Sequence, residues 1–443
     1  MTVRIRLRAR SILLSVVLCA FATRGCTRTE KISGPFPQEI YVWQRVWNEQ
    51  VEAALLTARD AAAGFAVLVA EIDVREREPK VIRPNVSFAA LKSSGRPIAL
   101  AIRVDPFAGP FREHDRVAEA IVKLARDEVA RARSHEIKVH ELQIDFDCGE
   151  SKLDGYRTWL KEIRVAVKPL PVVPTVLPSW LKRREFATLA RESGAFILQV
   201  HSVSVPQHVE DTRKLTDPRE AAAWVEQAAG VGVPFRVSLP TYSYLVAFDA
   251  EGKMCGISAE GSAARWPREA VRVRWEAQPD EMAGLIAQWT RARPAMLRGV
   301  FWYRLPVASD NLNWSWKTLA VAMQGRAPKS DLRVTASASQ PSEIVAINEG
   351  EKDEPLPEWI EARWSGSKLI AADALQGYEV RPSSEGNGVH FELSAAGRTL
   401  RLPPDGRRNV GWIRCESPTA IQVSVPARAV SADVAPVVAR DGN

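Results

Sequence analysis

Short apolar segments alternate with helical patterns eight times between residues 41 and 305, and this repeat constrains the fold more than any other feature of the sequence. Most of these segments are continuously hydrophobic, which is typical of parallel strands that are covered on both faces. The sequence therefore predicts an α/β fold whose strands lie at residues 41–44, 65–72, 98–104, 142–146, 172–177, 195–200, 235–239 and 300–305.

Helices are expected between these strands because the intervening segments have helical periodicity and suitable end signals. Asp217 precedes Pro218 at an expected helix start, and Gly64, Gly194 and Gly230 follow last turns, where a left-handed residue is favoured. Eight such alternations favour a (β/α)8 TIM-like barrel. An open doubly wound sheet is the alternative, although no glycine-rich phosphate loop follows any strand. The expected helices include residues 48–63, 113–133, 152–167, 181–192, 218–229 and 279–292.

The same patterns divide the chain into domains. We assign residues 38–326 to the barrel, within which residues 243–276 interrupt the alternation and predict a hairpin over one barrel end. Short alternating segments over residues 327–430 predict a small all-β, sandwich-like C-terminal domain. Its strands are expected at residues 332–336, 343–347, 359–364, 389–393 and 410–414, and residues 431–443 are expected to form a flexible tail.

The N-terminus carries four arginines and then an uncharged run, residues 11–22, that is too short to span a membrane as a helix. This pattern predicts a signal peptide over residues 1–22, followed by a linker over residues 23–37. Lipidation of Cys26, which follows an imperfect lipoprotein motif, is the alternative to simple cleavage. We therefore expect an exported protein, periplasmic or secreted, that meets a membrane only through a lipid on Cys26.

The net charge of +7 does not predict a nucleic-acid partner, because the four leader arginines supply more than half of it and leave +3. Basic runs such as residues 182–184 alternate with acidic residues, as on solvated helix faces. Cys148, Cys255 and Cys415 are far apart and lack CxxC spacing, which predicts neither a zinc site nor a disulfide scaffold. We expect no cofactor and no resident metal, and the oligomeric state stays open.

The segment 141–150 says most about function. Gln143, Asp145 and Asp147 alternate along an otherwise apolar strand and share one face. Carboxylates two residues apart lie about 6.5 to 7 Å apart along a strand. Burying them costs free energy unless they have hydrogen-bonding partners, a metal or a bound proton, or unless they serve a function. This arrangement predicts an active or ligand-binding site at the end of the strand.

Polar residues end several other predicted strands, and in barrels of this class the chemistry lies at the C-terminal strand ends. Each has a structural alternative: Arg103 can be a counter-ion for Asp145, and Glu150 can be a solvated residue at a helix N-terminus. The candidate catalytic residues are Asp145, Asp147, Glu150, Glu71 and His201; the candidate substrate-binding residues are Trp43, Arg103, Asp105, Gln143, Trp180, Gln199, Tyr242, Trp302 and Tyr303.

The aromatic members of this set lie at or just beyond the predicted strand ends. Indole and phenol rings there can stack on sugar rings, whereas core packing is the alternative use of each ring. A concave site that is both acidic and aromatic suits a carbohydrate better than a phosphate or a nucleotide. We therefore expect a polysaccharide or oligosaccharide partner.

Four motifs resemble a bacterial family known as domain of unknown function 3142: Tyr41-Val-Trp-Gln-Arg-Val-Trp47, Gln143-Ile-Asp-Phe-Asp147, Leu177-Pro-Ser-Trp-Leu181 and Gln199-Val-His201. This resemblance implies an exported protein and brings no established activity. The second motif is also distantly similar to the acidic DxDxE signature of chitinase-type glycosidases, in which Asp145 and Asp147 match. Gly149 stands where that signature has its glutamate, and Glu150 follows one position later.

Three hypotheses of different classes follow. In the first, a glycoside-hydrolase-like barrel, a protonated carboxyl at Asp147 or Glu150 donates to the leaving oxygen while Asp145 holds charge. The second is a non-catalytic cell-envelope protein that keeps only the sugar-binding mouth. The third is metal-dependent hydrolysis through Asp145, Asp147 and His201, which no HxxxH or HExxH spacing supports.

Overall fold

The computed structural model describes residues 30–425, except residues 77, 204–205, 212–213, 260–265, 268 and 384–385. The predicted signal peptide, the candidate lipid site at Cys26 and the predicted tail lie outside the described residues. The described chain begins with a short strand, β1 (Lys31–Ile32), which pairs antiparallel with β13 (Arg293–Pro294).

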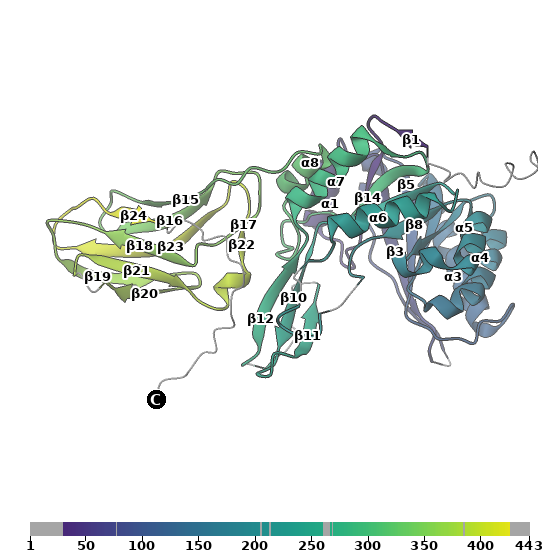
Figure 1. The fold of residues 1–443 in the computed structure, drawn as a ribbon, viewed down its shortest axis with the longest axis horizontal. Coiled ribbons are helices and arrows are strands. Elements are labelled where there is room, and N and C mark those ends of the chain that lie inside the picture. Colours follow the sequence, from purple (N-terminus) through teal and green to yellow (C-terminus); the bar gives the residue numbers. More distant parts are fainter. Residues whose placement is uncertain are drawn as a thin grey trace, which may run out of the picture.

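Eight parallel strands of the described chain form a closed barrel (Figure 1). They follow one another around the barrel in sequence order, and the last strand pairs with the first, which also pairs with the second. These pairs confirm the predicted (β/α)8 barrel and show that the open-sheet alternative is wrong. The strands are β2 (Gln38–Val42), β3 (Phe65–Asp73), β5 (Ile98–Val104), β6 (Val139–Phe146), β7 (Val172–Val176), β8 (Phe196–Gln199), β9 (Phe235–Pro240) and β14 (Leu297–Tyr303), and β4 (Lys80–Ile82) pairs antiparallel with β3.

Side chains of each barrel strand alternate between the interior and the helix-facing surface. On β2, Ile40 and Val42 belong to the large core beneath the helices, whereas Tyr41 belongs to a separate cluster inside the barrel. On β14, Phe301 lies inside and Trp302 faces the helices. Burial on both sides explains the continuous apolar runs. The alternation also decides which residues reach the mouth of the barrel.

Helices cover the outside of the barrel (Figure 1). Side-chain caps begin several of them: Asn48, Asp115 and Asp217 each accept hydrogen bonds from two main-chain N–H groups of the first turn. The helices are α1 (Glu49–Ala58), α2 (Phe88–Ser94), α3 (Arg116–Ser134), α4 (Leu153–Ala166), α5 (Arg184–Ser193), α6 (Pro218–Ala229), α7 (Pro279–Arg291) and α8 (Trp316–Met323), with 3-10 turns η1 (Glu150–Lys152) and η2 (Pro178–Lys182) before α4 and α5.

The three glycines expected at helix ends differ in conformation. Gly194 is left-handed, with φ of 75°, as predicted. Gly230 has φ of −63°, so the expectation of a left-handed residue there is wrong. Gly64 is not left-handed either, so the expectation is also wrong there. This glycine instead allows two segments to approach closely, because a Cβ at residue 64 would lie 2.9 Å from the Pro97 carbonyl oxygen.

The segment after β9 forms a three-stranded antiparallel sheet in place of the predicted hairpin. Strand β10 (Ser243–Phe248) lies between β11 (Met254–Ser258) and β12 (Val271–Glu276). Residues at the end of β11 line the barrel mouth, which agrees with the expected position of the insertion.

Two four-stranded antiparallel sheets of the C-terminal part share one core, as in a β-sandwich (Figure 1). This confirms the predicted all-β fold of this part. One sheet has the order β15 (Leu332–Ala336), β16 (Ser342–Asn348), β23 (Arg407–Cys415), β19 (Leu369–Ala374), and the other β20 (Tyr378–Pro382), β21 (Gly388–Leu393), β18 (Trp359–Arg363), β24 (Gln422–Ser424); β17 (Glu354–Pro355), β22 (Arg401–Leu402) and the turn η3 (Gly397–Thr399) lie beside them.

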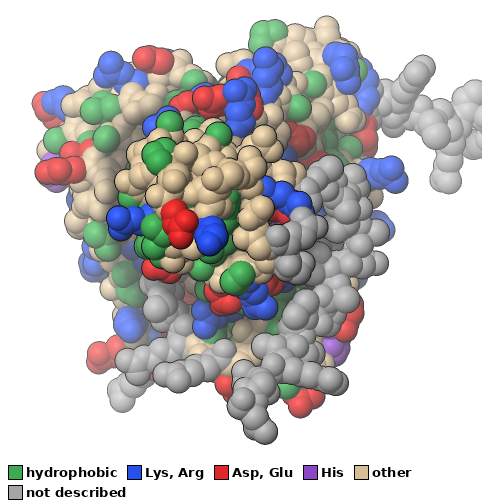
Figure 2. All heavy atoms as spheres, turned by 90° about the vertical axis from the view of Figure 1, so that its left-hand side faces the viewer, with side chains coloured by type: hydrophobic (Ala, Val, Ile, Leu, Met, Phe, Trp, Pro, Cys, Tyr) green, Lys and Arg blue, Asp and Glu red, His purple; other side chains and the backbone are tan. Residues whose placement is uncertain are grey.

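Acidic and basic side chains are mixed over the end of the molecule shown in Figure 2, with no large area of one sign. Within the described residues, every helix is too short or too polar to cross a lipid bilayer. Cys148, Cys255 and Cys415 are free thiols.

Candidate functional site

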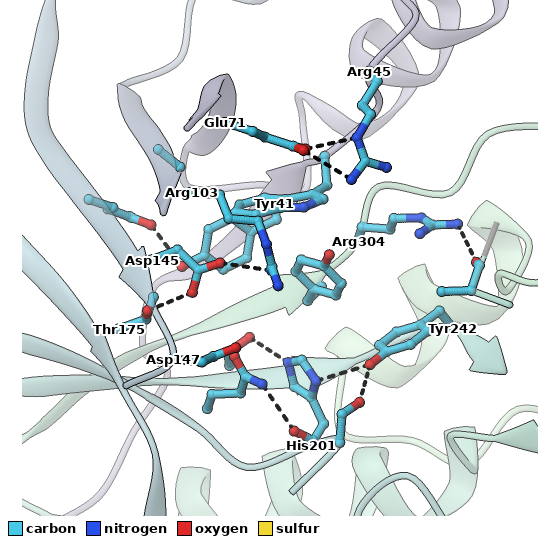
Figure 3. Close-up of a pocket in the computed structure, with 18 of the residues that line it drawn as sticks. Tyr41, Arg45, Glu71, Arg103, Asp145, Asp147, Thr175, His201, Tyr242 and Arg304 are labelled. Carbon is cyan, nitrogen blue, oxygen red and sulfur yellow. Dashed lines mark hydrogen bonds and ion pairs between the residues drawn. The ribbon is translucent and has the colours of Figure 1, made fainter. Parts of the chain in front are cut away.

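A cavity of about 650 Å³ opens at the C-terminal ends of the barrel strands (Figure 3). Its lining comes from most of the barrel strands and, on one side, from residues 257–259 of the insertion. Arg304 fixes this side, because its Nη2 donates to the Ala259 carbonyl oxygen at 3.2 Å and its guanidinium pairs with Asp310 at 2.5 Å.

Asp145 is buried at the floor of the cavity and is held by two donors. Arg103 Nη1 donates to one carboxylate oxygen at 3.1 Å, and Thr175 Oγ1 donates to the other at 2.7 Å. Arg103 is therefore a counter-ion for Asp145, which is the structural alternative considered for that arginine. Both donors stabilise Asp145 as a carboxylate.

Asp147 follows Asp145 on the same face and is exposed in the cavity. It makes no hydrogen bond or ion pair with any described residue. Loss of solvation, together with the negative charge of Asp145, raises the pKa of Asp147 to about 6, although Arg103 acts in the opposite direction. The cavity therefore contains one carboxyl group that can be protonated or ionised near neutral pH.

The other candidate carboxyl groups differ in position. Glu71 lines the cavity and accepts two hydrogen bonds from Arg45, at 2.8 and 3.2 Å. Asp105 also lines the cavity, without an ion pair to a described residue. Glu150 lies outside the cavity lining, in η1, where it pairs with Arg183. The structure thus brings Glu71, Asp105, Asp145 and Asp147 together and leaves Glu150 apart.

His201 forms a neutral side of the cavity with hydroxyl groups. Its Nε2 lies 3.1 Å from Ser238 Oγ, and its Nδ1 lies 3.3 Å from the Tyr242 hydroxyl. Burial lowers the pKa of His201 to about 3, so the ring is uncharged at neutral pH. Tyr242 in turn contacts the hydroxyl groups of Ser202 and Tyr244. This side offers neutral donors and acceptors to a ligand.

A buried hydrogen-bonded chain begins at the floor of the cavity, where Tyr41 and Gln143 are part of the lining. Tyr41 donates to Gln143 Oε1 at 2.7 Å, and Gln143 Nε2 donates to Glu141 at 2.7 Å. Glu141 also pairs with Arg236 at 2.7 Å, and Arg236 pairs with Glu39 at 3.1 Å. Gln143 is therefore fixed by partners on both ends of its amide, at the level of the barrel interior.

The predicted aromatic residues divide between the cavity and the core. Trp43, Tyr242 and Tyr303 line the cavity, and the rings of Trp43 and Tyr303 pack edge to face, with centroids 5.3 Å apart. Trp180 and Trp302 are fully buried outside the cavity, so their assignment to substrate binding is not supported. Trp302 points toward the helices because its neighbours on β14, Phe301 and Tyr303, point into the barrel. Trp180 lies beyond the end of β7, in η2, and its indole N–H donates to the Cys148 carbonyl oxygen.

Gln199 lines the cavity, and its Nε2 donates to the His201 carbonyl oxygen at 3.2 Å. Sequence reasoning missed Arg45, Thr175 and Ser238, which also line the cavity. The sequence could have indicated two of them, because Thr175 and Ser238 are polar residues within largely apolar strands. Arg45 continues the inward alternation of β2 by two residues from Trp43.

The described residues contain no group of three or more His, Cys, Asp and Glu side chains that is placed to hold a metal ion. Both ring nitrogens of His201 face hydroxyl groups. The metal-dependent hypothesis therefore has no ligand set in the part of the chain that the structure describes.

Comparison with known protein families tests the resemblance inferred from the sequence. Residues 94–308 match a family described as domain of unknown function (DUF3142). The predicted resemblance is confirmed over this region, which includes three of the four quoted motifs; residues 41–47 precede it. Residues 332–416 match a second family, also described as a domain of unknown function (DUF8456). No curated protein matches the sequence.

Solved structures with a similar arrangement share little sequence with this chain. The spore cortex-lytic enzyme SleL of Bacillus megaterium is 12% identical, with 67% of this chain and 75% of that chain covered and a TM-score of 0.45. A chitinase from Chromobacterium violaceum is 13% identical, with 66% and 99% covered and a TM-score of 0.43. A xylanase and alpha-amylase inhibitor protein from Scadoxus multiflorus is 11% identical, with 66% and 100% covered and a TM-score of 0.40.

Proposed function

We propose that the barrel is a glycoside hydrolase that binds a polysaccharide in the cavity and protonates the leaving glycosidic oxygen from Asp147. The observation that carries this proposal is the state of Asp147: exposed in the cavity, without a protein partner, and with a pKa raised to about 6. A general acid needs a pKa near the working pH and a clear path to the substrate.

Neighbouring residues support this assignment. Asp145, held by Arg103 and Thr175, places a fixed negative charge beside the proton donor, and such a charge stabilises the positive charge that develops on the sugar ring. The edges and faces of Trp43 and Tyr303 offer an apolar surface for the sugar. Asp105 is the remaining cavity carboxyl without a described ion-pair partner and is our candidate for the second carboxylate of the reaction.

A non-catalytic sugar-binding protein of the cell envelope is the second candidate function. One observation favours it: Glu71 and Asp145 are both paired with arginines, and His201 is neutral, so the cavity holds few groups free to act as a base or nucleophile. Such a protein would use the same lining to bind a glycan without cleaving it.

Release of reducing ends from a panel of polysaccharides by the wild-type protein and by the Asp147→Asn variant separates these functions. We expect the wild type to cleave at least one glycan, with a rate that declines about tenfold per pH unit above pH 6, because the acid form of Asp147 is lost. We expect Asp147→Asn to reduce turnover by at least about a hundredfold while binding is retained.

Asp73→Asn is the matched control, since Asp73 also ends a barrel strand but pairs with Arg75 and does not line the cavity. This variant should keep wild-type turnover. If the wild type binds a glycan of the panel but releases no reducing ends from any, the binding function replaces the enzymatic one.

We also propose that the protein is exported, on the basis of the leader pattern in residues 1–22. Mass spectrometry of the mature chain from a bacterial host tests this: removal of residues 1–22 or a lipid on Cys26 supports export, and a full-length cytosolic chain contradicts it.

A further inference from the structure

A second pocket, of about 270 Å³, lies on the C-terminal sandwich, over the sheet that contains β16, β23 and β19. Trp412 on the inner strand β23 is half-buried and lines this pocket. The neighbouring Val410 and Ile413 are fully buried in the sandwich core, to which Trp412 does not belong. Trp412 therefore projects from the outer face of the sheet.

Strand register places a carboxylate on each side of the Trp412 indole. Glu343 of β16 and Asp373 of β19 are the residues directly opposite Trp412. Side chains that oppose each other in an antiparallel pair have Cβ atoms about 4.5–5.5 Å apart. A residue with hydrogen-bond acceptors therefore neighbours Trp412 on each adjacent strand, and Glu343 also lines the pocket.

Other polar side chains of the pocket have unused hydrogen-bonding capacity. The side chains of Glu343, Asn409 and Arg414 make no hydrogen bond or ion pair with any described residue. Arg414 and Asn409 supply donors, and Glu343 supplies acceptors. Within the lining, the charges of Glu343 and Arg414 offset each other, and Asp373, which lies opposite Trp412, adds one negative charge beside it. These charges disfavour an anionic polymer and leave a neutral one as the fitting ligand.

Apolar side chains complete the pocket. Ile370 and Leu375 line it with 56% and 39% of their surface exposed, and both are among the few large hydrophobic residues exposed in this part of the chain. A sugar ring presents C–H groups on its faces and hydroxyl groups around its edge. An indole and aliphatic side chains, bordered by donors and acceptors, are complementary to both kinds of surface.

We propose that this surface, the Trp412 platform (Trp412, Glu343, Asn409, Arg414, Ile370 and Leu375), binds a neutral polysaccharide chain. The platform is separate from the barrel cavity and needs no turnover there. Its role is to hold the protein on a polymer, so that the barrel meets the same material repeatedly and at a high effective concentration.

The test uses the full chain carrying Asp147→Asn, which blocks turnover, and measures depletion from solution by insoluble cellulose, chitin and xylan. Substitution Trp412→Ala should weaken binding to at least one of these by about tenfold, through loss of the aromatic contact. Trp359→Ala is the matched control: Trp359 is the half-buried tryptophan of the opposite sheet and packs on His390, with centroids 4.6 Å apart. This control should retain binding within about twofold.

Equal binding by the Trp412→Ala and Trp359→Ala proteins, or no binding of any of the three polymers by the Asp147→Asn protein, overturns the inference. Thermal unfolding of both variants identifies a loss of fold, and in that case Arg414→Gln replaces Trp412→Ala in the same comparison. The outcome is distinguishable from that of the proposed function: turnover tests Asp147, whereas the Trp412→Ala comparison tests the platform in a protein that cannot turn over.

Discussion

Ionisation of Asp147 is opposed by the fold, which has a consequence for stability as well as for catalysis. The pKa of this carboxyl rises from 3.8 to about 6 on folding, so the folded chain binds a proton that the unfolded chain has released. Stability is therefore highest below about pH 4 with respect to this group, declines between about pH 4 and 6, and stays constant above. Substitution Asp147→Asn removes this decline, because the amide does not ionise.

We expect the melting temperature of Asp147→Asn, relative to wild type, to rise from pH 4 to pH 7, as measured by differential scanning fluorimetry at intervals of half a pH unit. Asp73→Asn, which replaces a half-buried carboxylate paired with Arg75, should show no such rise. A difference between Asp147→Asn and wild type that is independent of pH would contradict the raised pKa. This measurement needs no knowledge of the substrate.

Residue spacing was sufficient to predict which side chains at the end of β6 face the cavity, since Gln143, Asp145 and Asp147, the residue after the strand, follow its two-residue period. It was insufficient where a residue lies in a turn. Glu150 is in η1, beyond the strand, and its pairing with Arg183 joins segments that the sequence keeps apart. The same limit applies to Trp180, whose position in η2 has no strand period to indicate its direction.

Among the elements, the barrel strands share a buried ionic group at their N-terminal side. Arg236 of β9 pairs with Glu39 of β2 and Glu141 of β6, whose side chains are each only 9% exposed. The guanidinium also lies over the Phe301 ring of β14, 4.8 Å from its centroid. One arginine thus compensates two buried carboxylates and connects strands on different sides of the barrel.

Arg236→Met should destabilise the protein by about 3–5 kcal/mol, because it leaves both carboxylates buried without a cation. The loss should be larger at pH 8 than at pH 5: burial raises the pKa of Glu39, and without Arg236 both acids can avoid buried charge only by protonation at lower pH. Urea unfolding at the two pH values measures this. Arg75→Met is the control and should have little effect, because the Arg75 side chain is 60% exposed. Equal losses for the two variants would show that the ionic group contributes no more than a surface pair.

The elements themselves were predictable to different degrees. Strand β5 was predicted at its observed bounds because its run is apolar except for Arg103 and is followed by Asp105. Strand β12 was not predicted as part of a three-stranded sheet, since it alternates arginines with apolar residues and its pairing with β10 depends on contacts across a long loop. In the sandwich, β19 and β20 were missed because most of their side chains are small or polar and only partly buried, so neither strand has a clear apolar face.

At the scale of the whole molecule, the insertion sheet contacts both the barrel mouth and the sandwich (Figure 1). Glu276 at the end of β12 accepts hydrogen bonds from Arg274 at 3.0 Å and from Arg401 of the sandwich at 2.7 Å. Arg274 also donates to the Thr399 carbonyl oxygen at 3.1 Å. The sandwich therefore supports the sheet that forms one side of the cavity.

Substitution Glu276→Gln should loosen this junction, because it leaves Arg274 and Arg401 facing each other without the charge that separates them. Burial raises the pKa of Glu276, but Arg401 and Arg274 outweigh it and lower the pKa below its usual 4.5. The junction in the wild type is thus fully stabilised above about pH 4.5 and weakens as the pH falls through the lower, folded-state value. In the variant, this contribution is already lost at neutral pH.

Hydrogen–deuterium exchange at pH 7 measures the effect: Glu276→Gln should accelerate exchange in β12 and in residues 397–402, with smaller changes in β6 and β18. Asp405→Asn is the matched control, because Asp405 also joins the sandwich to the barrel, through Lys317, but at an exposed pair that contributes little. Accelerated exchange in both variants would mean that the junction depends on each of its ion pairs, and not on Glu276 in particular. Acceleration in Glu276→Gln alone, extending to residues 257–259, would show that the sandwich controls the position of the cavity wall and so takes part in the site without lining it.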